Sequence, residues 1–355
     1  IVFGDWSSDV CSSDLFDGGT SWTEFKKGLP TIAVRDIAIQ ERENDLVIAT
    51  FGRGFYVIDD YTPLRNYSKD IIGKPGYIFP VRDAKMFVQT SNFDQQGAMY
   101  YLADNPPYGA TITYYVDTVP KTDSDIRKEK EKKLVEKGEY IPQPTARELS
   151  IEEREIRPYL IFTITDDEGN VINKLYKSAS KGVNRITWNF TYAGYQPVRP
   201  TEKFTPVSGS GGRSRWGGGG IAVMPGRYFV SMAMYAKGEV KELAGPEPFV
   251  CQPLDIVTMP ATNPEARERW LKEVTAFART AYGAISYASE LESRINTIMQ
   301  TIHQTPEAPA SLMQEAAALN EEMAEIGYLI RGITVGASTE EDRKSTRLNS
   351  SHRIR

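Results

Sequence analysis

The spacing of apolar residues changes once along this chain, near residue 260. Before that point, short runs rich in Val, Ile, Tyr and Phe alternate with polar residues at a period of two, as in β-strands. After it, apolar residues recur every three or four positions over about four heptads, as in an amphipathic helix. We therefore predict a mainly β fold with a C-terminal α-helical hairpin at residues 261–335.

The first helix of this hairpin has a clear start signal. The sequence Thr262-Asn-Pro-Glu combines a polar cap with a proline in the first turn. The apolar pattern continues to about Ile302, and some 39 residues at 1.5 Å each would give a rod of roughly 58 Å. A second helix is predicted after a cap near Ser311. The two should pack antiparallel, joined by residues 303–310.

Residues 66–260 are predicted to form an immunoglobulin-like β-sandwich. Alternating runs such as ATITYYVD and YLIFTITDDEGNVINKLYKS provide its strands, with a hairpin turn at residues 166–169. A charged insertion at 118–157 and a Gly-rich loop at 205–221 interrupt the pattern. We expect the most charged part of the insertion, Lys121–Glu139, to be either a solvated helix or a disordered arm.

The two ends of the chain share an unusual relationship. DRKSTRLNSSH, beginning at Asp342, can be back-translated to a DNA string whose reverse complement encodes DWSSDVCSSD, beginning at Asp5. Two unrelated protein termini would not be complementary strands of one DNA string. We therefore interpret most of residues 1–15, and residues 342–355, as translated sequencing adapter and set them aside from fold reasoning.

Composition excludes several classes of function. Lys and Arg total 42 against 47 Asp and Glu, a net charge of −5, which argues against a nucleic-acid binder. No apolar run is long enough for a spanning helix. With the ends set aside, Cys251 and His303 are the remaining cysteine and histidine, so zinc clusters and His-based triads are disfavoured. We predict no catalytic residue, metal ligand or cofactor in this chain, with calcium bound to carboxylates as a weaker alternative.

The start of the β part contains a compact motif. FDGGTSW matches the core of an Asp-box, in which Asp17 accepts main-chain hydrogen bonds across a hairpin and Gly19 provides an unusual backbone conformation. Ser21 completes the motif, and Trp22 would fill the space between adjacent sheets. Three short strands of period two follow between residues 34 and 59.

Together these motifs resemble the closing blade of BNR/Asp-box β-propellers. That group comprises bacterial secreted proteins related to the sortilin propeller, often labelled glycosyl hydrolases. Its D-G-G-x-[ST]-W, G-L-P, V-R-D-I-x-I and T-x-G-R-G segments follow one another here at Asp17, Gly28, Val34 and Thr50. The resemblance implies that residues 16–65 are one closing blade of a larger array.

The resemblance also implies a location and a role. It predicts an extracytoplasmic protein whose C-terminal region is non-catalytic and supports scaffolding and the binding of a polypeptide or glycan through the full propeller, with polypeptide favoured. The alternative is a fragment of a propeller glycoside hydrolase whose catalytic carboxylates lie in upstream blades. Phe51 and Arg53 are candidate propeller-rim binding residues, although a structural inter-blade hydrogen bond is the favoured role for Arg53.

Overall fold

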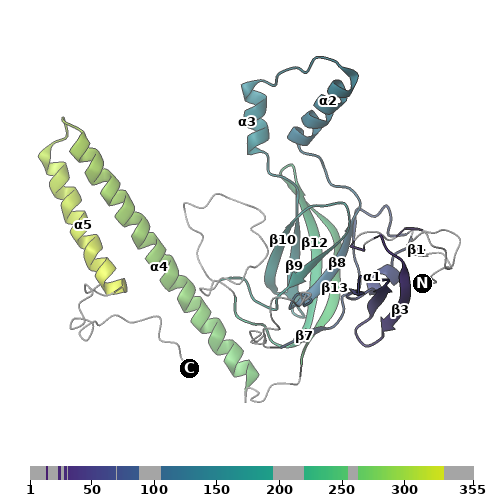
Figure 1. Ribbon diagram of the computed structural model, residues 1–355. Helices are drawn as coiled ribbons and strands as arrows, with labels where there is room; N and C mark the ends of the chain where they lie inside the picture. The colour runs from purple at the N-terminus through teal and green to yellow at the C-terminus, as the bar shows by residue number, and fades with distance from the viewer. Residues whose placement is uncertain are drawn as a thin grey trace. The chain divides into compact units, whose positions relative to one another are not determined.

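The described part of the chain divides into two units, one containing all the strands with three helices and the other containing the two longest helices. The computed structural model describes residues 28–29, 31–68, 70–87, 105–194, 220–254 and 263–331, together with the paired two-residue strands β1 (Ser13–Asp14) and β2 (Thr23–Glu24). Figure 1 shows the elements of each unit.

A three-stranded antiparallel meander follows the Asp-box segment in sequence. Its strands are β3 (Val34–Gln40), β4 (Asp45–Thr50) and β5 (Phe55–Ile58), in the order β3-β4-β5. The short helix α1 (Thr62–Arg65) comes directly after. We call these strands the blade-like sheet.

The blade-like sheet has a small core on one of its two faces. Leu46 and Ile48 of the central strand are buried there, together with Tyr61 just before α1. Val34 and Ile37 pack partly against the same cluster, although they are three residues apart. A β-bulge between Val34 and Asp36 explains this spacing, because one extra residue restores both side chains to the same face.

A β-sandwich of eight strands follows, and it forms the largest core. One sheet has the order β10-β9-β12-β13-β7, and the other has the order β11-β8-β6. The strands of the five-stranded sheet are β7 (Ala84–Met86), β9 (Tyr159–Asp166), β10 (Val171–Ser178), β12 (Gly226–Ala236) and β13 (Glu239–Pro253). Those of the three-stranded sheet are β6 (Gly76–Ile78), β8 (Ala110–Val116) and β11 (Gly182–Trp188).

A local turn signal correctly predicted the β9–β10 hairpin of the five-stranded sheet. In the β9–β10 turn, Asp166 Oδ1 accepts the N–H groups of Glu168 at 3.1 Å and Asn170 at 2.8 Å. The parallel pairing of β7 with β13 had no such local signal.

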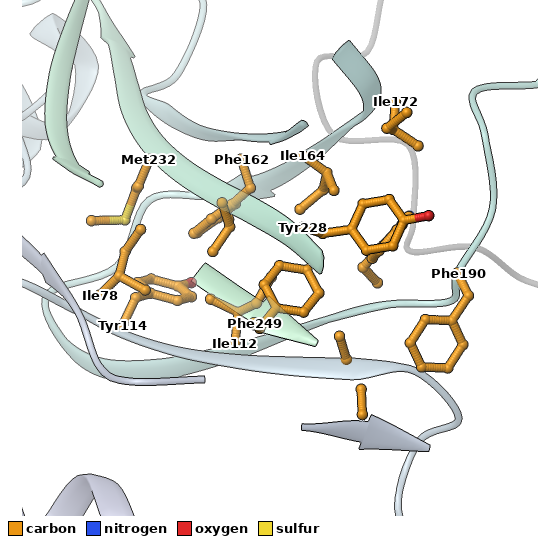
Figure 2. Packing of buried hydrophobic residues seen from close by; sticks show 14 of the residues in the cluster. Ile78, Ile112, Tyr114, Phe162, Ile164, Ile172, Phe190, Tyr228, Met232 and Phe249 are labelled. Carbon is orange, nitrogen blue, oxygen red and sulfur yellow. The ribbon is translucent and has the colours of Figure 1, made fainter. Parts of the chain in front are cut away.

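Side chains from both sheets of the sandwich fill one continuous core. Phe162 of β9 packs against Tyr114 of β8 in the opposite sheet, with ring centroids 4.8 Å apart, and Met232 of β12 belongs to the same cluster (Figure 2). Trp188 at the end of β11 is fully buried and its Nε1 donates to Thr191 O at 3.0 Å. Its indole ring contacts three other aromatic rings, those of Phe190, Tyr228 and Phe249.

The charged insertion forms two ordered helices, α2 (Asp123–Lys137) and α3 (Ala146–Arg154). The sequence analysis left a helix and a disordered arm as alternatives for the most charged part of the insertion, Lys121–Glu139. This part forms a helix. Thr122 caps α2, and Arg127 makes a two-pronged ion pair with Glu152 of α3, at 2.7 and 2.8 Å. The ion pair of Arg127 with Glu152 thus joins the two helices of the insertion.

Two arginines of the sandwich unit contact the blade-like sheet. Arg82 Nη1 donates to the main-chain oxygen of Glu43 at 2.6 Å, and Arg185 Nη2 donates to Asp60 O at 2.7 Å. Lys177 of β10 donates to the main-chain oxygen of the same Arg185. Hydrogen bonds thus link the edges of the sandwich to one end of the sheet, where the β3–β4 turn and the end of β5 lie together.

The second unit consists of α4 (Pro264–Gln304) and α5 (Ala310–Arg331). The helices lie side by side in Figure 1, and a Cβ placed on Gly327 would come within 3.3 Å of Glu292 Oε1. Small residues at this contact allow the close approach expected from the sequence. The predicted fold class, mainly β with a C-terminal helical hairpin, is confirmed.

The second helix begins slightly earlier than its predicted cap. It starts at Ala310, and Ser311 lies inside its first turn. Pro309 immediately precedes the helix, and its carbonyl accepts the Leu312 N–H at 3.1 Å. Proline is well suited to this position because it needs no N–H partner there.

Candidate functional site

The residues of the predicted Asp-box fall outside the described part of the chain. Asp17, Gly19, Ser21 and Trp22 all precede β2, which begins at Thr23. Their roles therefore stay predictions from the sequence.

The predicted rim residues Phe51 and Arg53 lie together in the turn that joins β4 to β5. Thr50 closes this turn, because its N–H and its Oγ1 both donate to Gly54 O, at 3.0 and 2.8 Å. Gly52 and Gly54 have φ values of +80° and +72°, a conformation that other residues rarely adopt. The turn is thus well defined and presents Phe51, 62% exposed, and Arg53 to solvent.

A third residue joins them that the sequence analysis did not select. Arg35 lies with its guanidinium carbon 4.5 Å from the centroid of the Phe51 ring. The Phe51 N–H donates to Ala33 O at 2.9 Å, which holds the turn against the start of β3. The sequence does contain a signal for the position of Arg35. Val34 and Ile37 are three residues apart in a strand whose apolar residues otherwise alternate, and this spacing indicates a bulge at Arg35.

The other face of the blade-like sheet is mostly apolar. Residues directly paired across strands share a face, so Ala38, Val47 and Val57 form one row, and Ala49 and Phe55 form the next with Asp36 at its edge. Phe55 is 75% exposed and Val57 is 55% exposed. We call the five apolar residues of these rows the open face. A sheet that met water on this side would normally carry polar residues there.

The described residues offer little support for metal binding or for catalysis by a cysteine. No group of three or more His, Cys, Asp or Glu side chains in that part of the chain is arranged to hold a metal ion. Burial raises the pKa of the Cys251 thiol to about 12, so little reactive thiolate forms near neutral pH. His303 lies in the last turn of α4.

None of the helices in the described ranges combines the length and the apolar character that crossing a bilayer requires.

Comparison with known proteins gives little further information. No protein-family model matches the sequence, and no curated protein does so. Among solved structures, the chain has a weak likeness to dimeric latent PorU from Porphyromonas gingivalis, with a TM-score of 0.22 and 10% identity. That match covers 59% of this chain and 12% of PorU.

Proposed function

We propose that this chain is a non-catalytic C-terminal region of a secreted, sortilin-like BNR/Asp-box propeller protein. In this role it supports scaffolding and the binding of a polypeptide or glycan. The blade-like sheet joins the propeller, the sandwich acts as a spacer, and the turn at Phe51 and Arg53 contributes to the binding rim. The extracytoplasmic location is part of this proposal and rests on the sequence resemblance.

The open face is the single observation that carries the proposal. A three-stranded sheet with apolar side chains on both faces needs a covering layer on each of them. Leu46, Ile48 and Tyr61 supply one core, whereas Phe55 and Val57 face solvent. A neighbouring blade would cover them, because blades of a propeller pack face to face around a central axis.

Two further observations support a scaffolding role. Arg82 and Arg185 bond to two main-chain oxygens at one end of the blade-like sheet, which would transmit its position to the sandwich. The buried side chains of the sandwich are mostly aromatic and aliphatic, as in a structural core.

The test compares this chain with a longer protein that includes the preceding segments encoded in its source genome. Val57→Lys should leave the unfolding free energy of the present chain nearly unchanged, within about 0.5 kcal/mol, because the side chain is already exposed. In the longer protein it should destabilise by about 2 kcal/mol or more, since a lysine would then be buried against the next sheet. Denaturant titration followed by tryptophan fluorescence measures both.

Ile72→Lys is the matched control, because Ile72 is 51% exposed and lies outside the blade-like sheet. It should be neutral in both proteins. If Val57→Lys is equally neutral in the longer protein, the open face is not a blade interface and the proposal is wrong.

A further inference from the structure

We infer that Arg35, Phe51 and Arg53 form a binding site for the carboxylates of an acidic polypeptide segment. We call these residues the Arg35–Phe51–Arg53 cluster. The inference rests on the proposed function, because it names the partner chemistry of the proposed rim and adds Arg35 to it.

The cluster is organised before any ligand arrives. Main-chain hydrogen bonds at 2.9 and 3.0 Å fix the turn that carries Phe51 and Arg53 against β3. The Arg35 guanidinium lies over the Phe51 ring at 4.5 Å, which limits its rotation while its edge N–H groups stay available. A planar guanidinium held in this way matches the geometry of a carboxylate.

Charge complementarity identifies the partner as acidic. Within the described ranges, neither Arg35 nor Arg53 takes part in any of the ion pairs, whereas Arg42, Arg82 and Arg127 each pair with a glutamate. The nearest carboxylate in sequence, Asp36, accepts the Ile37 N–H at 2.8 Å. In a chain with more acidic than basic residues, two unpaired arginines beside an exposed ring are well placed for an external carboxylate.

Apolar surface next to the arginines favours a polypeptide over an acidic glycan. Phe51 lies in the turn itself and is 62% exposed, so it can contact apolar side chains that alternate with acidic ones. In addition, β3 and β5 are the outer strands of the blade-like sheet in the described part of the chain, where an extended peptide can add as a further strand. A polysaccharide of uronic acids offers neither feature.

The experiment uses the full 355-residue chain and a fluorescein-labelled peptide of alternating Leu and Glu. Fluorescence anisotropy should show saturable binding that weakens with added salt. Arg35→Ala and Arg53→Ala should each weaken it by about three- to tenfold, the range for charge-assisted contacts at a partly exposed site. Arg35→Lys should recover less than half of this loss, because lysine keeps the charge and lacks the planar fork.

Arg42→Ala is the matched control, since Arg42 lies in the β3–β4 turn at the opposite end of the same sheet and pairs with Glu43 at 3.3 Å. It should leave the affinity unchanged. Circular dichroism of every variant should match that of the parent chain, because all three arginines are exposed.

Four results would overturn the inference. They are no saturable binding, equal binding of a Leu–Gln peptide, tighter binding of oligogalacturonate than of the Leu–Glu peptide, and an equal loss in Arg42→Ala. Because this experiment does not involve the open face, its failure leaves the Val57→Lys test of the proposed function intact, and the two failures can be told apart.

Discussion

The blade-like sheet and the β-sandwich are built from similar strands but differ in how they bury them. In the sandwich, two sheets cover each other, and residues such as Phe162 and Trp188 are fully buried. In the blade-like sheet, a single layer covers one face and leaves Phe55 and Val57 exposed on the other. A pattern of apolar residues therefore shows that a sheet needs covering layers, and the structure shows which layers the chain itself provides.

The largest effect in this comparison should come from the centre of the sandwich. Trp188→Ala should destabilise by about 3–5 kcal/mol, because it leaves a large cavity among Phe190, Tyr228 and Phe249. Urea unfolding monitored by far-ultraviolet circular dichroism measures this loss. A loss below about 1 kcal/mol would show that the sandwich is not the main cooperative core.

A smaller effect is expected for the core of the blade-like sheet. Ile48→Ala removes a buried side chain from β4 and should cost about 2 kcal/mol, the lower end for such changes, because the layer around it is thin. Native-state hydrogen exchange should show faster exchange in β3–β5 with little change in β9 and β12. If residues 34–60 were the slowest-exchanging segment of the parent chain, the contrast between the two regions would be wrong.

The α2–α3 insertion tests whether a local element is independent of the sandwich. Thr122→Ala removes the bond from Asp125 N to Thr122 Oγ1, 3.1 Å long, and should cost about 1 kcal/mol. Exchange should accelerate in α2 and stay unchanged in β8 and β9. Thr122→Ser keeps the hydroxyl and should behave like the parent; a similar loss in both variants would assign the effect to packing of the methyl group.

Sequence reasoning predicted those parts of the fold that depend on neighbours in the chain. The helix start at Pro264 and the turn at Asp166 have their determinants within a few residues, and both were predicted. The pairing of β7 with β13 depends on residues far apart in sequence, so no local pattern indicated it. Whether residues 121–139 would form an ordered helix was undecided for a similar reason. The contact of Arg127 in α2 with Glu152 in α3 joins residues far apart in sequence.

Two residues of the candidate site were selected from the sequence, and their binding role stays a prediction. Phe51 and Arg53 were selected from a turn motif, and the structure places them in one turn. Arg35 was missed because its position beside Phe51 follows from the register of β3 with β4 and from the bulge. Cross-strand contacts of this kind require the register, which the apolar pattern alone does not give.

The smallest effect should be found on the open face of the present chain. Phe55→Ser should change the unfolding free energy by no more than about 0.5 kcal/mol, because the ring is 75% exposed and loses few contacts. The same variant should reduce concentration-dependent self-association in sedimentation experiments, since exposed apolar patches promote it. Tyr140→Ser is the control, because Tyr140 is 82% exposed but lies outside the blade-like sheet. A loss of more than about 1 kcal/mol in Phe55→Ser alone would mean that this face is already covered in the isolated chain, and the difference between the two regions would disappear.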